Sequence, residues 1–258
     1  MDRSATIGVV VALAGIGVGL HLDGCKVGQL LQPTAALIVF GGTLGAVVVQ
    51  FPFAVMKRAV AQLQPVFMGS SDPAAALIED LSRYAMQARR NGLLSLDSEL
   101  EMVRNPFLRK GLMLAVDGSR ANDLRDTMEM VMQTEADQED LLPKVFEAAG
   151  GYAPTIGILG AVIGLIQVMQ RLDNINEVGR GIAVAFVATI YGVGAANLLF
   201  FPCAGRIRIL MHRRQVLREL MLEGVLAIVE RTSPRVLEAK LAVYVEGPAR
   251  KPVTLAGK

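Results

Sequence analysis

Four long stretches of the chain contain no Asp, Glu, Lys, Arg or His, and they limit its fold more than any other feature. A helix needs about 20 apolar residues to cross ~30 Å of hydrocarbon. The charge-free stretches are residues 4–20, 27–56, 148–170 and 181–205. We therefore predict four transmembrane helices, with approximate cores at residues 5–20, 34–51, 153–170 and 181–201.

The composition agrees with a membrane protein. Of the 258 residues, 52% are hydrophobic and 19% are charged, and the mean hydropathy is +0.43. A soluble domain has about 25% charged residues, so a purely soluble enzyme is disfavoured. The first stretch follows Met1-Asp2-Arg3, which has no net charge, and no A-x-A pattern follows it. We expect a retained anchor rather than a cleaved signal peptide.

The positions of the basic residues predict an orientation. Of the 26 Lys and Arg residues, 22 lie in residues 57–144 and 206–258, which an even number of spans places on one side. Because cytoplasmic loops carry the excess of Lys and Arg, both segments and the N-terminus are expected in the cytoplasm. The expected regions are residues 1–52 with two spans, 53–150 as a cytoplasmic domain, 151–204 with two spans, and 205–258 as a cytoplasmic tail.

The two cytoplasmic segments have helical patterns and opposite charge. The middle segment has 15 acidic and 11 basic residues, whereas the tail has 5 acidic and 11 basic residues. Capping and stop signals predict helices at residues 74–90, 106–116 and 121 to about 142. The tail repeats apolar residues at helical spacing as an amphipathic continuation of the fourth span, up to Ser233-Pro234. We predict an all-α polytopic membrane protein.

The spans contain small residues but no ionisable ones. Ionisable residues inside a membrane usually mark an ion path, so this chain alone is not expected to relay protons. Glycine and alanine recur at a spacing of four, which lets helices approach closely, although generic intrachain packing is an equal alternative. These residues are Gly15, Gly19, Gly41, Gly45, Gly157, Gly160, Gly164, Gly192 and Ala196.

Two prolines are expected at the cytoplasmic ends of the last two spans. Pro154 is predicted to open the third span near its first turn, and Pro202 to close the fourth. The tolerance of helix ends for proline explains both positions without a functional role. A hinge that couples the membrane helices to the cytoplasmic domain is the alternative.

No catalytic or metal-binding constellation is present in the sequence. Motifs for nucleotide, serine-hydrolase and zinc-protease sites are absent, and the basic tail has one aromatic residue, which disfavours nucleic-acid binding. Cys25 and Cys203 are expected at opposite membrane faces, which excludes a disulfide or a shared metal site. We expect no enzyme, no metal and no cofactor.

One charged cluster surrounds the predicted break at Asn91-Gly92. It consists of Arg89, Arg90, Asp97, Glu99 and Glu101, and we call it the five-charge cluster. From the residues alone, a solvated turn between two helices is favoured over a recognition surface by about two to one.

Several motifs, in this order and spacing, resemble the A subunits of flagellar motor stators, the MotA/PomA family. Together they extend over nearly the whole chain. The motifs are Gly41-Gly42-Thr43, the stretch from Arg89 to Asp97, Asn105-Pro106-Phe107-Leu108 with Val116-Asp117-Gly118, Ala153-Pro154 with Gly157, Gly160 and Gly164-Leu165, Ala188-Thr189-x-Tyr191-Gly192, and Ser233-Pro234-Arg235.

The resemblance implies an ion-driven torque generator in the bacterial inner membrane. Five A subunits would surround two B subunits, each of which supplies one membrane helix with an essential Asp. Arg89 and Asp97 match positions that engage the rotor's switch-complex protein, with Arg90, Glu99 and Glu101 as neighbours. The residues implied for the ion path and coupling are Pro154, Gly157, Gly160, Ala161, Thr189, Tyr191 and Pro202.

The same resemblance favours protons over sodium as the coupling ion. Sodium-driven members have a Thr where this chain has Ala161, whereas Thr189 is kept. The alternative in the same broad class is an ExbB/TolQ-like proton-channel subunit that energises outer-membrane processes. Those chains resemble three-span proteins whose large cytoplasmic part follows the first span, whereas here it follows the second.

Overall fold

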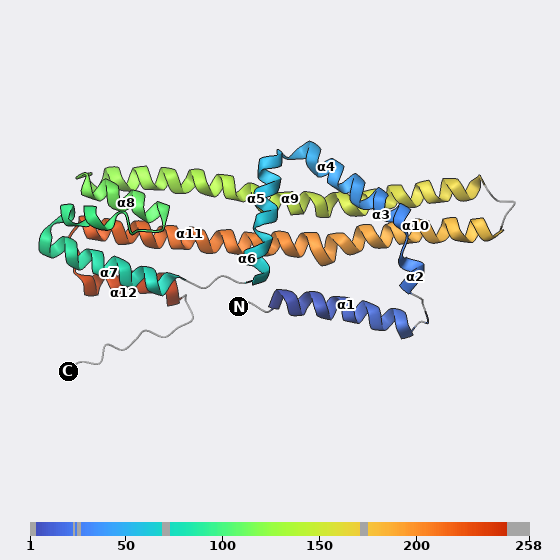
Figure 1. The fold of residues 1–258 in the computed structure, drawn as a ribbon, viewed down its shortest axis with the longest axis horizontal. Coiled ribbons are helices and arrows are strands. Elements are labelled where there is room, and N and C mark those ends of the chain that lie inside the picture. Colours follow the sequence, from blue (N-terminus) through green and yellow to red (C-terminus); the bar gives the residue numbers. More distant parts are fainter. Residues whose placement is uncertain (1–3, 23, 25–26, 69–72, 171–174, 247–258) are drawn as a thin grey trace. The chain divides into compact units, whose positions relative to one another are not determined.

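The computed structural model describes residues 4–22, 24, 27–68, 73–170 and 175–246, and all regular elements in this part of the chain are helices. The chain divides into two compact units. The first comprises Met1–Ser70 and Gln138–Leu210, and the second comprises Ser71–Asp137 and Met211–Lys258. Helices α9 and α11 contribute residues to both units (Figure 1).

Three helical segments are long and apolar enough to cross a membrane. They lie within Pro33–Gln50, Ala121–Met169 and Gly181–Val229. The first predicted span forms helix α1 (Ser4–Leu22), whose apolar part Ile7–Leu22 is shorter than the other three. The 19 residues of α1 extend over ~28 Å, close to the hydrocarbon thickness. The all-helical membrane fold is thus confirmed, and the span at α1 stays a prediction.

The second and fourth spans each contain a π-helical turn that no sequence pattern predicted. The second span consists of α3 (Pro33–Ala36), η1 (Leu37–Gly41) and α4 (Gly42–Gln50). The fourth runs without a gap through α10 (Ile175–Ala195), η3 (Ala196–Phe200) and α11 (Phe201–Val229). This continuity confirms that the tail begins as an extension of the fourth span.

The third span differs from the prediction because it does not begin near Pro154. Helix α9 (Ala121–Met169) is one helix of 49 residues, and both Pro143 and Pro154 lie inside it. The predicted end near residue 142 is therefore wrong. A proline removes one backbone hydrogen bond, and packing against a neighbouring helix compensates for that loss in membrane helices.

Pro202 likewise does not end the fourth span. It is the second residue of α11, directly after the π-turn η3. In that turn the Phe201 N–H donates to the Ala196 carbonyl, which is five residues back. This wider turn brings the chain into α11 at Pro202, so the helix continues through a residue that was expected to stop it.

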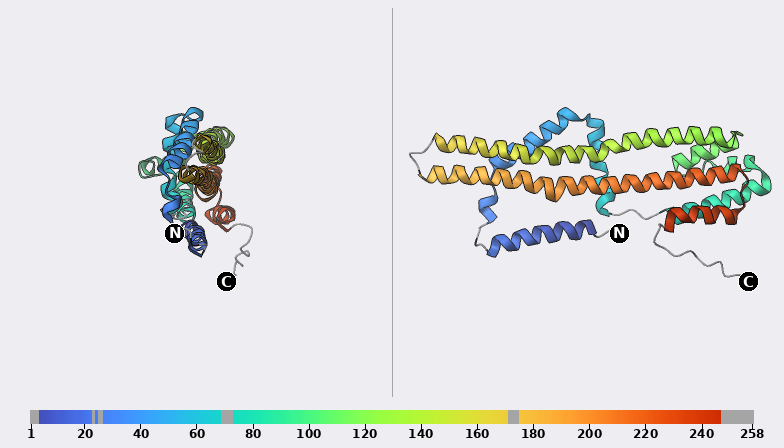
Figure 2. Two further views of the ribbon diagram at one scale, coloured as in Figure 1. Left: turned by 90° about the vertical axis from the view of Figure 1, so that its right-hand side faces the viewer. Right: turned by 180° about the vertical axis from the view of Figure 1, so that it is seen from behind.

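The first unit is built on two long helices that run side by side. The later part of α9 lies beside α10, as both views of Figure 2 and Figure 1 show. Helix α3 and η1 pack on α10 and form an apolar cluster. Its buried members are Ala35, Val39, Val187 and Ala188. Two short helices follow the second span, α5 (Phe53–Ala61) and α6 (Leu63–Met68).

The second unit is a small helical domain with its own core. It contains α7 (Ala74–Asn91), the 3-10 helix η2 (Leu93–Glu99), α8 (Pro106–Val116), α12 (Pro234–Glu246) and parts of α9 and α11. Burying a leucine side chain contributes about 1.5–3 kcal/mol, and this core has many such side chains. Fully buried leucines are Leu81, Leu96, Leu112, Leu124, Leu220, Leu237 and Leu241.

Local sequence signals set the end of α7 and the start of α8, whereas Asp72, the predicted cap of α7, lies outside the described residues. The side chain of Asn105 accepts hydrogen bonds from the backbone N–H groups of Phe107 (3.0 Å) and Leu108 (3.2 Å), which caps α8. Gly92 ends α7 with φ 85° and ψ 164°, a conformation that other residues rarely adopt. The predicted helices at 74–90 and 106–116 are confirmed.

Glu223 connects three helices of the second unit. Its carboxylate pairs with Arg125 of α9 (3.0 Å) and with Lys240 of α12. Burial alone would raise the pKa of Glu223, but the hydrogen bonds and charges of Lys240 and Arg125 outweigh it, so the pKa is lowered. Arg218 of α11 also pairs with Glu135 of α9 (2.9 Å).

The lowered pKa predicts a pH-dependent stability. A carboxyl group whose folded pKa is depressed stabilises the fold above its unfolded pKa, and that stabilisation is lost as pH falls through the folded pKa. Glu223→Gln is therefore expected to lower stability by about 1 kcal/mol at pH 7 and to have little effect at pH 3. Thermal unfolding of the purified protein at both pH values measures this difference. Glu238→Gln, an exposed carboxyl on α12, is the control, and equal effects of the two variants at pH 7 would contradict the prediction.

Candidate functional site

The backbones of α9 and α10 touch where glycines face each other. A Cβ atom at Gly157 would lie 2.9 Å from the carbonyl oxygen of Ala188, and one at Gly192 would overlap the carbonyl of Ala153. At Gly164 a Cβ would lie 3.2 Å from Ala185. Any side chain at Gly157 or Gly192 would have to displace backbone. The predicted close packing by small residues is confirmed for this helix pair, which we call the α9–α10 seam.

Not all predicted glycine pairs have this role. In the described part of the chain, a Cβ at Gly15, Gly19, Gly41 or Gly45 would meet no atom within 4 Å. Gly42 does approach a neighbour, since its Cβ would lie 2.9 Å from Ile156 of α9. The spacing of four residues therefore identified the α9–α10 seam correctly. In the second span it pointed to Gly41, whereas the neighbouring Gly42 makes the contact.

The residues predicted for the ion path lie on or near the seam. Gly157 and Gly160 are buried against α10, and a Cβ at Gly160 would also lie 3.2 Å from Ile38. Ala161 and Thr189 are half-buried, and the Thr189 hydroxyl donates to the Ala185 carbonyl at 3.4 Å. Intrachain packing thus accounts for the two glycines, and their role in ion passage stays a prediction.

Pro154 and Pro202 lie at neighbouring levels of the same helix pair. Phe201 packs on Gly150, where a Cβ would lie 2.7 Å from its ring, and Gly192 packs on Ala153. Pro154 is half-buried within α9, whereas Pro202 is exposed. Pro154 therefore lies within the stretch of α9 that contacts the fourth span, and Pro202 follows Phe201 at one end of that stretch.

Tyr191 holds the start of the second span on α10. Its hydroxyl donates to the Leu30 carbonyl and accepts a hydrogen bond from the Gln32 N–H at 3.2 Å. Its ring lies beside Phe40 of η1, with centroids 6.1 Å apart. Leu30 ends the short helix α2 (Val27–Leu30), so Tyr191 fixes the connection between α2 and α3. The motif identified this residue, but only the contacts show this positioning role.

Removing the Tyr191 hydroxyl leaves two backbone groups without their partner. Tyr191→Phe is therefore expected to destabilise the protein by about 1–3 kcal/mol and to lower its melting temperature. Tyr152→Phe is the matched control, because the Tyr152 hydroxyl donates only to the exposed side chain of Gln50 at 2.9 Å. A melting temperature lowered equally by both substitutions would refute the role of Tyr191.

Sequence reasoning missed the π-turns and the state of Thr43. Thr43 is 3% exposed, and its hydroxyl has no hydrogen-bond partner among the described residues. It follows η1 directly, and π-turns often occur at functional sites. Gly41-Gly42-Thr43 and the proline after η3 were the available signals, but neither predicts a π-turn.

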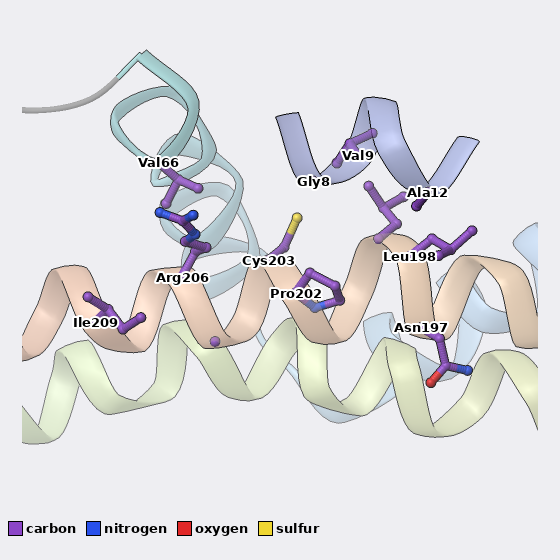
Figure 3. A pocket seen from close by; sticks show the side chains of 12 residues that line it. Gly8, Val9, Ala12, Val66, Asn197, Leu198, Pro202, Cys203, Arg206 and Ile209 are labelled. Atoms are coloured by element: carbon purple, nitrogen blue, oxygen red, sulfur yellow. The ribbon is translucent and has the colours of Figure 1, made fainter. Parts of the chain in front are cut away.

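A mostly apolar cavity of about 480 Å³ lies beside Pro202 (Figure 3). Helix α1 contributes Gly8, Val9 and Ala12, and α6 contributes Val66. Cys203 is a free cysteine, and its side chain is buried at this cavity. Cys25 lies outside the described residues.

The second unit presents the five-charge cluster on a fixed scaffold. Arg89 and Arg90 lie in the last turn of α7, and Asp97 and Glu99 lie in η2. Four of the five residues are exposed, and Glu99 is half-buried. Within the described residues, none of the five has an ion-pair partner. Glu223 of the same unit, by contrast, pairs with two cations, so the five-charge cluster is available for a partner.

Short hydrogen bonds fix the turn that carries the cluster. The side chain of Gln87 donates to the Ser95 carbonyl at 2.8 Å, and the Ser95 hydroxyl donates to the Gly92 carbonyl at 2.7 Å. Leu96 is fully buried between the charges and anchors η2 on the core. A turn held in this way fits a recognition surface better than a loose solvated loop.

Comparison with known proteins identifies the family. Residues 99–220 match the MotA/TolQ/ExbB proton channel family, and residues 6–91 match the Motility protein A N-terminal region. Motility protein A of Bacillus subtilis (strain 168) is 38% identical over 251 residues, which are 97% of this chain and 93% of that protein. This chain belongs to the MotA/TolQ/ExbB proton channel family. The Chemotaxis protein PomA of Vibrio alginolyticus is 30% identical over 95% of this chain and 96% of its own length.

Solved structures of this family have the same fold. A chain in the structure of C. jejuni MotAB has a TM-score of 0.90 at 29% identity, covering 99% of this chain and 100% of that chain. A chain of the flagellar MotAB stator complex from Bacillus subtilis has a TM-score of 0.86 at 38% identity, covering 95% and 96%. The resemblance to flagellar stator A subunits is confirmed, and the ExbB/TolQ alternative is disfavoured.

Proposed function

We propose that this family member is the A-type subunit of a flagellar motor stator, which converts ion flow across the inner membrane into torque on the rotor. The observation that carries this function is the near full-length similarity to motility proteins, including the N-terminal region. The rigid and unpaired five-charge cluster in the second unit supports it, because a torque generator must contact another protein.

The proposed partner in the membrane is a B-type subunit with one membrane helix and an essential Asp. The described spans of this chain contain no ionisable side chain, so a carboxylate that binds the ion has to come from another chain. Large apolar side chains on the outer faces of α1 and α9 are exposed and leave room for neighbouring subunits and lipid. They include Ile7, Val10, Leu13, Ile158, Leu159 and Val162.

We further propose an assembly of five A-type and two B-type subunits, with both termini of this chain in the cytoplasm. The excess of Lys and Arg in the middle segment and the tail supports this orientation. Helices α9 and α11 run without a break from the first unit into the second. A displacement at the α9–α10 seam therefore has a continuous helical connection to the unit that carries the five-charge cluster.

Charge reversal tests the proposed contact with the rotor's switch-complex protein. Arg89→Glu or Asp97→Lys is expected to weaken or abolish swimming while the protein still inserts into the membrane. The reversed side chain would then face a charge of the same sign on the rotor protein and repel it. Reversing the matching charge on the rotor should partly restore motility. Arg120→Glu, an exposed basic residue outside the cluster, is the control. Unimpaired swimming of the double variant Arg89→Glu, Asp97→Lys would contradict the proposal.

We propose protons as the coupling ion and no cofactor. A sodium ion needs several oxygen ligands, and Ala161 offers no side-chain oxygen to one. In a strain with this stator alone, swimming speed is expected to fall when the proton gradient is collapsed and to be independent of sodium. Sodium-dependent swimming that is insensitive to the proton gradient would overturn this proposal.

A further inference from the structure

A second cavity, of about 410 Å³, lies in the second unit between α7, η2, the connection after η2 and the start of α8. Its floor is apolar and buried, because Tyr84, Val103 and Leu108 are each less than 9% exposed. Leu77 is half-buried and forms one wall. We call this cavity the anchor pocket. Of its lining residues, only Glu99 belongs to the five-charge cluster.

Four charged side chains lie at the rim of the anchor pocket, and two of them form an ion pair with each other. Arg83 pairs with Asp80 at 3.0 Å and stacks over the Tyr84 ring at 5.1 Å. Glu99 and Arg104 also line the pocket, and neither has an ion-pair partner within the described residues. Two carboxylates and two guanidinium groups line one cavity, so the charges of the rim balance and favour neither a small anion nor a small cation. A partner with both a basic and an acidic group fits this rim.

Met102 connects the pocket with the surface. It lines the cavity, yet 67% of it is exposed, and it lies between Glu99 and Arg104 in the chain. A flexible methionine at the mouth of a pocket adapts to different apolar side chains. An apolar mouth between two free charges of opposite sign is typical of the centre and rim of a protein interface.

The anchor pocket is continuous with the five-charge cluster, because Glu99 belongs to both. We propose that the anchor pocket receives an apolar side chain of the rotor's switch-complex protein, flanked by a basic residue opposite Glu99 and an acidic residue opposite Arg104. This inference rests on the proposed function. Exposed charges steer association and contribute little affinity, whereas a buried apolar side chain at an interface contributes most of it.

Photo-crosslinking in swimming cells tests the occupant of the pocket directly. A photo-activatable benzoylphenylalanine replaces Met102 in the full chain, and adducts are identified with antibodies against the rotor protein and against this chain. Position 102 is expected to give an adduct with the rotor protein. Position 130 is the control, since Met130 of α9 is 72% exposed and does not line the pocket. Position 98, an exposed serine beside Asp97, reports on the rotor contact itself without removing a charge of the cluster.

Two substitutions test the contribution of the pocket without removing a charge. Met102→Ala removes the apolar mouth, and Leu77→Trp fills the cavity from its wall. Each is expected to weaken rotor engagement about tenfold or more, measured as the loss of labelled stators from motors. Met130→Ala should match the unmodified protein. Ion conduction by the purified complex should be unchanged in all three variants, which excludes misfolding as the cause.

The outcomes separate this inference from the proposed function. A rotor adduct from position 98 but none from position 102, with full engagement of Met102→Ala and Leu77→Trp, overturns the anchor pocket and leaves the rotor contact intact. An adduct of position 102 with a second copy of this chain also overturns it. No rotor adduct from either position overturns the proposed rotor contact as well.

Discussion

The backbone contact between α9 and α10 is the interaction on which the membrane part of this protein depends. Lipid tails are as apolar as leucine side chains, so the hydrophobic effect does not drive helices together within a membrane. Close approach provides the attraction instead, and Gly157 and Gly192 make it possible by placing no side chain between the two backbones. Once these helices are joined, α3 and η1 have a surface on which to pack, and Tyr191 can reach Leu30 and Gln32.

Both long helices continue from the seam into the second unit, where different interactions hold them. There the core is formed by leucines such as Leu124 and Leu220, and polar pairs around Glu223 connect α9, α11 and α12. The seam contains no charged side chain, whereas the second unit contains several ion pairs between its helices. A single helix such as α9 therefore passes from packing by small residues to packing by large ones, and its continuity joins the proposed ion-driven part to the part proposed to contact the rotor.

The unpaired charges of the five-charge cluster contrast with the ion pairs elsewhere in the second unit. Arg125, Arg218 and Glu223 form ion pairs that join helices of the second unit. The five-charge cluster has no ion pair within the described residues, although Leu96 and Ser95 hold its backbone firmly. Because the backbone of the cluster is already ordered, little conformational entropy is lost when a partner binds to it. The adjacent anchor pocket adds the apolar contact that charges alone do not provide.

The sequence by itself determined the apolar spans, the helical class, the family and the local helix ends. Charge-free length, the helix start at Pro106 and the Gly92 stop each depend on residues close together in the chain, which is why they could be predicted. Tertiary structure alone decided that α9 continues through Pro154, that η3 leads into Pro202, and that Gly42 rather than Gly41 meets α9. It also decided that Tyr191 binds the backbone at Leu30, about 160 positions away in the chain. Such features depend on which atoms of distant segments meet, and no local preference contains that information.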